Sequence, residues 1–360
     1  VGADKTSRLV ALTHGPMLSA ENAETITIEN LTFDGSGKAP GGEKGLLEFH
    51  NVGDLRFVNC TIQGSAGYGI KLEGCGGRVE STAFRNIAES ALFSLDGAGL
   101  SVIGNRIEDC GNNGLQIWRS EAGGDGARLR GNHIARIRAK RGGNGPYGNG
   151  INVFRAADVI CESNVISACG FSAIRYNASS NGLISANQCS DLGEVAIYVE
   201  FGSLGAIVQR NQVNGASSGI SITNIDKHGR IATCSGNVVR NLDRPTPQGH
   251  EAFGIGIQIE KDTIASGNHI ERAQLVGMRL GFGDALRNVI ATSNVITDCT
   301  TGIDVTVVPH TGPASILRNS IDKAKQGAIV GMEWDKMTVP NLIEAAARYP
   351  ELSIAGNRIG

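Results

Sequence analysis

The sequence predicts an all-β chain folded as a parallel β-helix (solenoid) of about a dozen coils, with a short C-terminal helix. Three observations predict this fold class. Gly supplies 50 of the 360 residues, an Asn phrase recurs at intervals of 23 to 32 residues, and an alternating β-type phrase follows most copies of it. Each Gly inside a helix costs about 1 kcal/mol relative to Ala, so this composition argues against long helices.

The Asn phrase consists of Asn, any residue, and then an aliphatic residue. Its clear copies begin at Asn105, Asn132, Asn164, Asn211, Asn237, Asn268, Asn294, Asn319 and Asn357, and weaker copies stand at Asn30, Asn59 and Asn187. Asn tolerates left-handed backbone and bonds to nearby backbone groups, so we expect it at bends between strands. Stacked coil upon coil, these side chains would form an amide ladder.

The second phrase is a small residue followed by an alternating run, typified by Gly-Ile-Lys-Leu-Glu at residues 69–73. Period-two alternation predicts short strands with one buried face, here called Gly-Ile strands. Other copies cover residues 114–118, 150–154, 173–177, 196–200, 219–223, 277–280 and 302–306. Two or three such strands in each repeat are typical of a β-solenoid coil.

We expect one domain over residues 1–360, with residues 1–25 as a partial first coil and a helical insertion at residues 335–350. The eight Cys contain no Cys-x-x-Cys pair, so we expect buried thiols and no structural zinc site. The net charge of −2 gives no basic excess for nucleic acid. No run of 18 apolar residues exists to span a membrane.

Outward positions of stacked Gly-Ile strands form two parallel rows. The first row is expected to hold Lys71, Ser94, Gln116, Asn152, Arg175, Tyr198, Ser221, Arg279 and Asp304. The second is expected to hold Glu73, Asp96, Trp118, Phe154, Asn177, Glu200, Thr223 and Thr306, with Glu260 and Glu333 nearby. Lengthened loops at residues 119–126, 136–150 and 243–253 are candidate walls of a binding face.

The repeats resemble the right-handed parallel β-helix superfamily typified by pectate lyases. The chain is also similar to a bacterial family of twin-arginine-translocated repeat proteins of uncharacterised function. The segments that carry this closer resemblance are 117–121, 150–155, 193–198 and 327–334. The resemblance implies a right-handed β-helix and export, and hence a periplasmic or secreted protein. It assigns no activity.

A solenoid face with such rows predicts a groove for an oligosaccharide or polysaccharide, in which polar groups take hydroxyls and aromatics take ring faces. We expect Arg175, Tyr198 and Glu200 to be catalytic. The expected substrate-binding residues are Glu73, Asp96, Trp118, Arg119, Asn152, Arg155, Asn177, Glu260, Arg279, Asp304 and Glu333.

Two enzymatic options compete, with a polysaccharide lyase slightly favoured. A lyase needs a base and positive charge beside a uronate carboxylate, and an acidic Ca²⁺ site could assist it. A glycoside hydrolase or glycan transferase needs paired carboxylates. Rungs spaced about 4.8 Å would place Glu73 and Asp96 roughly 5 Å apart, and Glu200 and Glu260 roughly 9.6 Å apart. The third option is a non-catalytic carbohydrate-binding or cell-envelope structural protein.

Overall fold

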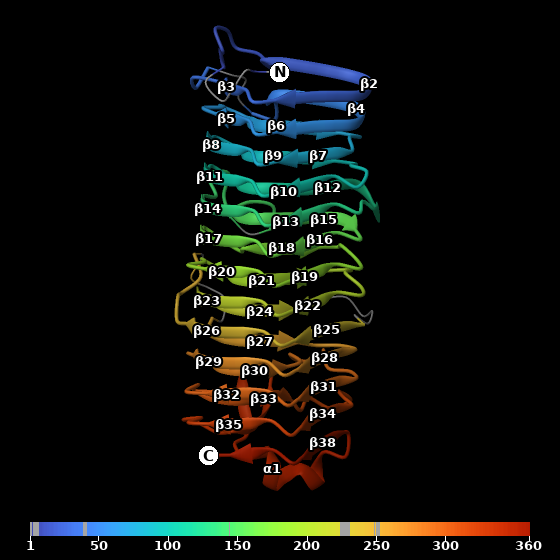
Figure 1. Cartoon of the computed structure of the whole chain (residues 1–360). Coiled ribbons are helices and arrows are strands. Elements are labelled where there is room, and N and C mark those ends of the chain that lie inside the picture. Colours follow the sequence, from blue (N-terminus) through green and yellow to red (C-terminus); the bar gives the residue numbers. More distant parts are fainter. Residues whose placement is uncertain are drawn as a thin grey trace. The chain divides into compact units, whose positions relative to one another are not determined.

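The computed structural model describes residues 2, 7–38, 42–143, 145–223, 231–247, 249 and 253–360, in two compact units, residues 1–183 and 184–360. Each unit is a parallel β-helix in which the strands line up coil upon coil in three series (Figure 1). We call the series the Asn-phrase sheet, the Gly-Ile sheet and the third sheet. About 58% of the chain is strand, in about 12 turns, which confirms the predicted fold class.

Most strands of the first unit are short, but β2, β4 and β12 have 12 to 14 residues each. Its Asn-phrase sheet contains β1 (Arg8–Val10), β3 (Thr32–Asp34), β5 (Thr61–Gln63), β8 (Ala83–Ile87), β11 (Arg106–Cys110), β14 (His133–Ile137) and β17 (Val165–Cys169). Its Gly-Ile sheet contains β2 (Leu18–Glu29), β4 (Gly45–Val58), β6 (Tyr68–Glu73), β9 (Ser90–Leu95), β12 (Asn113–Gly124), β15 (Asn149–Ala157) and β18 (Ile174–Asn177). The ends of β2 and β4 continue into the third sheet, with β7 (Gly77–Glu80), β10 (Ser101–Ile103), β13 (Arg128–Arg130) and β16 (Ile160–Glu162).

The second unit repeats the pattern, and β19 (Leu183–Ser185) spans the point in the sequence where it begins. Its Asn-phrase sheet contains β20 (Gln188–Ser190), β23 (Gln212–Ala216), β26 (Val238–Leu242), β29 (His269–Ala273), β32 (Val295–Thr297), β35 (Ser320–Asp322) and β39 (Arg358–Ile359). Its Gly-Ile sheet contains β21 (Val195–Glu200), β24 (Ser218–Ile222), β27 (Ile255–Ile259), β30 (Val276–Leu280), β33 (Thr301–Thr306) and β36 (Ile329–Glu333). Its third sheet contains β22 (Ile207–Gln209), β25 (Ala232–Ser235), β28 (Thr263–Ser266), β31 (Val289–Thr292), β34 (Ala314–Leu317) and β38 (Leu352–Ala355).

The segment predicted as a helical insertion at 335–350 is only partly helical. It opens with β37 (Lys336–Val339), which pairs antiparallel with β36. One turn of helix, α1 (Leu342–Ala345), follows and runs into a 3₁₀ turn at Ala346–Arg348. Asn341 caps α1 by accepting a bond from the Glu344 backbone N–H. Among the described residues, no helix is long and apolar enough to cross a membrane.

The predicted amide ladder is present in both units. In the first unit, Asn105 Nδ2 donates to Asn132 Oδ1 at 2.9 Å, and Asn132 Nδ2 donates to Asn164 Oδ1 at 3.0 Å. In the second unit the ladder runs through Asn187, Asn211, Asn237, Asn268, Asn294, Asn319 and Asn357. Each Oδ1 also accepts the backbone N–H of the preceding ladder residue, so the amides satisfy backbone groups inside the coil.

Two details of the Asn prediction are wrong. Left-handed backbone belongs to the residue before the ladder Asn, as at Gly104 (φ 63°), and not to the Asn itself. Asn30 and Asn59 are themselves such left-handed residues, each with φ 56°, and lie outside the ladder. In these first coils the ladder position belongs to the residue that follows the left-handed one. Thr82, which follows the left-handed Ser81, is an example: its hydroxyl accepts the Cys60 backbone N–H, and its own backbone N–H donates to Asn105 Oδ1.

The interior of each coil is apolar and closely packed. The inward-facing aliphatic residues of all three sheets are buried, and all eight Cys are buried free thiols, as predicted. The small residue that opens a Gly-Ile strand is required sterically, because a Cβ at Gly69 would lie 2.4 Å from the Ala91 carbonyl oxygen. This close stacking leaves only the outer faces and the loops for function.

Candidate functional site

A line of aromatic rings follows the outer face of the Gly-Ile sheet in the first unit. Tyr68 stacks on Phe93 with ring centroids 5.1 Å apart. Phe93 meets Trp118 edge to face at 5.5 Å, and Trp118 meets Phe154 at 5.6 Å. Tyr68 and Phe93 are buried, whereas Trp118 and Phe154 are half-buried and leave part of their surface exposed.

A polar wall stands beside these rings and consists of buried amides that hold the 138–148 loop. Trp118 Nε1 donates to Asn152 Oδ1 at 2.7 Å, and Asn152 Nδ2 donates to the Gly145 carbonyl at 3.1 Å. Asn149 Nδ2 reaches the same carbonyl at 2.9 Å. Gly145 has φ +97°, a backbone conformation that favours Gly, so its carbonyl can serve both amides.

The rings and the wall enclose a hollow of about 250 Å³. We call it the aromatic groove, and it is lined by Trp118, Gly145, Pro146, Asn152, Phe154 and Asn177. The structure therefore brings the predicted residues Trp118, Asn152 and Asn177 to one place. A mostly apolar hollow with a few convergent amides is the usual composition of an organic-ligand site.

The opposite rim carries Arg155, which was also predicted. Its guanidinium lies 4.8 Å from the centre of the Phe154 ring, and Nη1 donates to the Ser120 carbonyl at 2.7 Å. Asp96 accepts from the Ser120 backbone N–H at 2.9 Å and from Oγ at 2.8 Å. Asp96 is thus a rim residue that fixes β12 at Ser120.

The predicted pairing of Glu73 with Asp96 is wrong, because β9 is shifted by one residue. Phe93 pairs with Lys71 and Leu95 pairs with Glu73, while Ser94 points into the core. The small Ser94 fits inside, and Phe93 gains its ring contacts outside. Glu73 instead lies beside His50, with Oε2 3.3 Å from Nδ1.

Arg119, another predicted binding residue, belongs to a cluster of buried polar atoms at the turn after β9. Ser94 Oγ, Arg119 Nε and Asp125 Oδ2 have no hydrogen-bond partner among the described residues. A Cβ at Gly97 would lie 2.8 Å from that Ser94 oxygen and 3.3 Å from that Asp125 oxygen, so Gly97 keeps a small space open between them. Burial raises the pKa of Asp125, with Arg119 opposing and Asp96 reinforcing the effect.

Sequence reasoning missed Tyr68, Phe93 and Glu89 as parts of this face. Glu89 Oε1 accepts from Arg141 Nε at 3.0 Å, and its Oε2 accepts from Asn112 Nδ2 at 2.5 Å. Burial and the nearby Glu89 charge raise the pKa of Tyr68 to about 12. The alternation in residues 90–95 is a signal for Phe93, but it fits either register of β9 equally well.

In the second unit, Arg279 and Asp304 are bound to each other. Arg279 Nη2 lies 2.8 Å and Nε 3.0 Å from Asp304 Oδ2, and both side chains are more than nine-tenths buried. Phe282 covers the guanidinium at 5.9 Å and packs edge to face on Trp334. Both residues were predicted to bind substrate, which stays a prediction; in the structure each is the ion-pair partner of the other.

The remaining predicted residues are placed as follows. Glu260 is buried directly after β27, and Glu333 is exposed at the tip of the β36–β37 hairpin opposite Lys336. Arg175 is buried in β18, where it pairs in register with Asn152. Tyr198 and Glu200 belong to β21 of the second unit. A catalytic role for Arg175, Tyr198 and Glu200 therefore stays a prediction.

Two family models match the chain. The model described as "Right handed beta helix region" matches residues 44–138, and that described as "Periplasmic copper-binding protein (NosD)" matches residues 126–346. A search of curated proteins found no match.

Solved structures of similar fold include the catalytic domain of a GH87 α-1,3-glucanase in complex with tetrasaccharides. It has a TM-score of 0.56 and 10% identity, over 99% of this chain and 70% of that chain. The Streptococcus pneumoniae surface protein and adhesin PfbA has a TM-score of 0.47 and 8% identity, over 98% of this chain and 92% of that chain. The DFA-IIIase of Arthrobacter chlorophenolicus A6 has a TM-score of 0.42 and 12% identity, over 83% of this chain and 82% of that chain. At such identities the glucanase likeness shows the fold alone.

The family description names copper, but the donors that the structure describes do not fit it. Copper prefers accessible thiolate, thioether and imidazole ligands. All eight thiols are buried, and burial raises the pKa of Cys110, Cys161 and Cys234 to about 12. Among the described residues, no group of three or more His, Cys, Asp or Glu could hold a metal ion, Ca²⁺ included. We therefore derive no chemistry through a metal.

The fold and the family match agree on what kind of chain this is. Its coils, its amide ladder and its three sheets are those of a right-handed β-helix, and the longer of the two matches covers more than half of its residues. The chain belongs to the family described as "Periplasmic copper-binding protein (NosD)".

Proposed function

We propose that this chain binds an oligosaccharide or polysaccharide in the aromatic groove of its first unit. The observation that carries the proposal is the half-buried pair Trp118 and Phe154, whose rings lie beside the amides of Asn152 and Asn177 in a hollow of about 250 Å³. Sugars offer apolar ring faces and polar edges, so a groove of rings and amides complements both. The glucanase of similar fold was solved with tetrasaccharides, so a protein of this fold can bind an oligosaccharide.

The groove is also preorganised. Trp118 is fixed by Asn152, Asn152 is fixed by Gly145, and Phe154 is covered on one side by Arg155. Side chains already held in place lose little rotamer freedom on binding, which favours affinity. The wall includes Gly145 and Asn149 of the predicted 136–150 loop, and Arg155 on the rim bonds to Ser120 of the predicted 119–126 loop.

The test is a panel of soluble neutral and acidic polysaccharides, with binding measured by calorimetry. Trp118→Ala should weaken at least tenfold the binding of any polysaccharide of the panel that binds the wild-type protein. The matched control is Trp334→Ala, which alters the second of the two tryptophans, in the other unit, and should leave binding unchanged. No binding across the panel, or equal losses in both variants, would refute the proposal.

Cleavage of the bound glycan is a second candidate, and Asp125 is the observation that favours it. A glycosidase needs one protonated and one ionised carboxyl group. Burial keeps a proton on Asp125 to higher pH, and Asp96 lies near enough to influence it. Asp125 would donate its proton to the glycosidic oxygen as the C–O bond breaks, and Asp96 would take a proton from the attacking water.

The lyase that we slightly favoured from the sequence needs a base that is unprotonated near neutral pH. Arg175 and Tyr198, the residues predicted for that chemistry, stay predictions. Reducing-sugar release and ultraviolet absorbance of unsaturated products separate the two chemistries on any glycan that binds. Loss of sugar release in Asp125→Asn, with binding retained, supports hydrolysis. Unsaturated products, or unchanged release in this variant, overturn it.

We further propose that the protein acts in the periplasm or outside the cell. The family description and the exported family that the sequence resembles support this location. Export through the twin-arginine route stays a prediction. Fractionation of cells that express the full gene tests the location, and recovery only in the cytoplasm would contradict it.

A further inference from the structure

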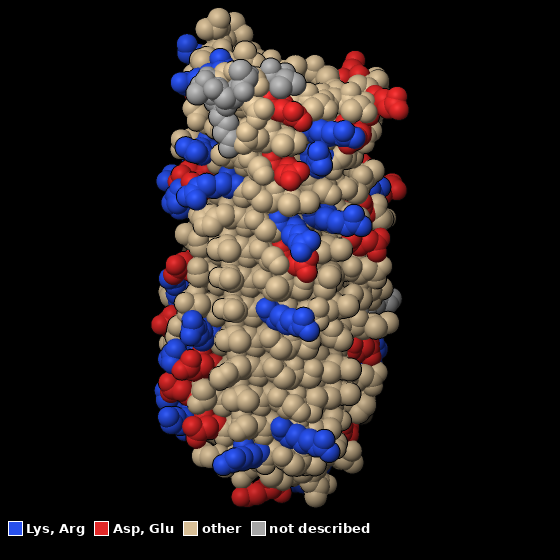
Figure 2. All heavy atoms as spheres, viewed as in Figure 1, with Lys and Arg blue, Asp and Glu red and all other residues tan. Residues whose placement is uncertain are grey.

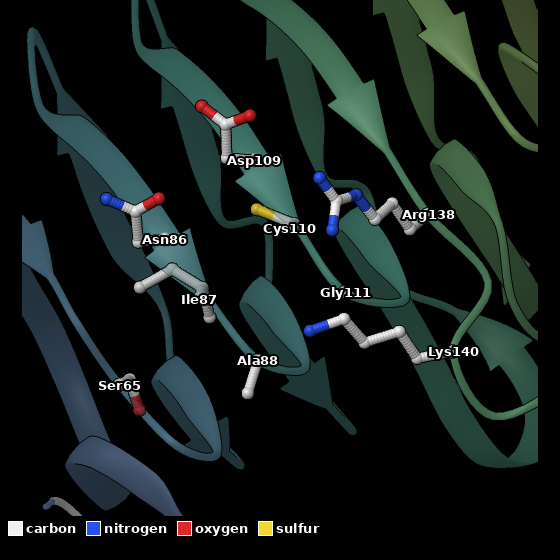
Figure 3. A pocket seen from close by; sticks show the side chains of 9 residues that line it. All are labelled: Ser65, Asn86, Ile87, Ala88, Asp109, Cys110, Gly111, Arg138 and Lys140. Carbon is white, nitrogen blue, oxygen red and sulfur yellow. The ribbon is translucent and has the colours of Figure 1, made fainter. Parts of the chain in front are cut away.

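A second hollow of about 230 Å³ lies in the first unit, where the chain bends after β8, β11 and β14. We call it the basic pocket. It is lined by Ser65, Asn86, Ile87, Ala88, Asp109, Cys110, Gly111, Arg138 and Lys140. Figure 3 shows the Arg138 and Lys140 side chains both reaching toward Cys110, Gly111 and Ala88.

The backbone builds this pocket from successive rungs. The Ala88 N–H donates to the Ser65 carbonyl, the Gly111 N–H to Ile87, and the Lys140 N–H to Gly111, at 2.9 Å each. Gly111 is required here, because a Cβ would lie 1.8 Å from the Ala88 carbonyl oxygen. It would also lie 3.2 Å from Lys140 Cδ, so the missing side chain lets Lys140 lie across the bend.

The acidic groups around the pocket are already neutralised. Arg136 binds Asp109 through two hydrogen bonds of 2.8 Å, and it lies 3.4 Å from Glu108. The Arg136 guanidinium holds the pKa of Asp109 below its usual range. Arg141 in turn binds Glu89. The two other basic residues of this loop, Arg138 and Lys140, therefore add positive charge that no ion pair described above balances.

Arg138 and Lys140 are those two cations. Both are exposed, and neither side chain makes an ion pair or hydrogen bond within the described parts of the chain. Figure 2 shows basic side chains gathered along the edge where β8, β11 and β14 lie. Arg138 also lies in the field of Asp109, whose carboxylate Arg136 already binds, so the hollow keeps an excess of positive charge that favours an anion.

The polar atoms of the lining also favour an anion. The Ser65 hydroxyl is committed, since it donates to the Tyr68 carbonyl at 2.7 Å and accepts the Gly67 N–H. The donors that remain are the Arg138 guanidinium, the Lys140 ammonium and the Asn86 amide. A volume of about 230 Å³ is smaller than the roughly 300–1,000 Å³ of sites for drug-sized ligands, so it suits one charged group with its sugar ring.

We propose that the basic pocket binds an anionic substituent, a carboxylate or a sulfate ester, of the glycan held in the aromatic groove. This inference rests on the proposed function. The two sites share one loop, which contributes Arg138 and Lys140 to the pocket and Gly145 and Pro146 to the groove. The substrate class is then an acidic polysaccharide, and the pocket distinguishes it from a neutral one.

The first experiment tests the pocket by itself with monosaccharides. Glucuronate, glucose 6-sulfate and glucose are titrated into ¹⁵N-arginine-labelled protein, and the side-chain Nε–Hε signals are followed by NMR. A saturable shift of the Arg138 signal is expected with glucuronate or the sulfate but not with glucose. The stronger of the two acidic arms identifies the substituent. No shift with either acid, or an equal shift with glucose, overturns the proposal.

The second experiment separates the pocket from the groove, using an acidic oligosaccharide and its carboxyl-reduced neutral form. Arg138→Gln/Lys140→Gln should weaken binding of the acidic form at least tenfold, reduce its salt dependence and leave the neutral form unaffected. Arg318→Gln/Lys323→Gln, an equal charge change in the second unit, should alter neither. Trp118→Ala should weaken both forms.

The outcomes are distinguishable. If the wild-type protein binds neither form, the proposed function fails. If it binds both with the same affinity, or if the Arg138/Lys140 variant binds the acidic form normally, the basic pocket has no such role while the groove stands. Binding of a single-stranded DNA oligomer as tight as that of the acidic glycan would also overturn the proposal.

Discussion

The indole Nε1 of Trp118 donates a 2.7 Å hydrogen bond to Oδ1 of Asn152, which joins β12 to β15 in the wall of the aromatic groove. Asn152 is buried and its Nδ2 holds the Gly145 carbonyl, so one amide fixes both a ring and a loop. The outer face of the Gly-Ile sheet is therefore ordered at this point, with a ring, an amide and a loop held in one arrangement.

Asn152→Leu should weaken glycan binding about tenfold, equivalent to about 1.4 kcal/mol. The change removes the acceptor that orients Trp118 and the donor that holds Gly145, while keeping a similar volume. Calorimetry with a polysaccharide that binds the wild-type protein measures the effect. Gln258→Leu, on the Gly-Ile sheet of the second unit, is the control. An unchanged affinity in Asn152→Leu would show that this bond does not organise the groove.

The ladder amides should contribute strongly to stability. Asn211 is fully buried, donates to Ile184 O and Asn237 Oδ1 at 3.0 Å, and accepts from Asn187. Asn211→Ala leaves several buried groups unpaired, at about 1–3 kcal/mol each, so we expect a loss of about 3–5 kcal/mol in urea unfolding. Asn214→Ala, at an exposed site, should cost under about 0.5 kcal/mol. Similar losses of unfolding free energy in both variants would contradict a stabilising role of the amide ladder.

Asp125 and Asp109 should give opposite pH dependences of stability. Burial raises the folded pKa of Asp125, so its contribution declines as pH rises from the unfolded pKa through the folded one. Arg136 lowers the folded pKa of Asp109, so that contribution is present above the unfolded pKa and is lost as pH falls through the folded one.

Urea unfolding at a series of pH values checks both signs. Relative to the wild-type protein, Asp125→Asn should gain stability as pH rises through the acidic range. Asp109→Asn should lose stability over the same rise. Differences of the same sign in the two variants would show that the two environments have been misassigned.

Removal of one charge of the buried Arg279–Asp304 pair should lower the free energy of unfolding strongly. Asp304→Asn leaves the Arg279 charge buried without its counter-charge, so we expect a loss of about 3–5 kcal/mol. Arg279→Met/Asp304→Leu removes both charges and should recover most of that loss. Glycan binding in the first unit should be unaffected. A smaller loss in the single variant than in the double one would refute the structural role.

The sequence was sufficient to predict the repeat, the amide ladder, the buried thiols and the outward rows that contain Trp118, Asn152 and Asn177. It could not fix the register of β9, because Phe93 and Ser94 both fit an alternating pattern and only the stacking of Phe93 between Tyr68 and Trp118 decides between them. The Arg279–Asp304 pair was equally hidden, since opposite charges on adjacent rungs can bind each other or a ligand.

The loops were the least predictable part. Their length indicated candidate walls of a binding face. The basic pocket, however, depends on which of the basic residues at 136–141 form ion pairs with carboxylates. Arg136 and Arg141 do so through contacts with Asp109 and Glu89, residues of other coils, whereas Arg138 and Lys140 do not. Such long-range pairings follow from the stacking of the coils and not from the local sequence.

A crystal structure of the protein soaked with an acidic oligosaccharide that binds in solution tests the central claim most directly. The account predicts a sugar ring against Trp118 and Phe154, within hydrogen-bond distance of Asn152 or Asn177, and an acidic group at Arg138 and Lys140. Sugar density on another face, with the aromatic groove empty at full occupancy of the ligand, would contradict it.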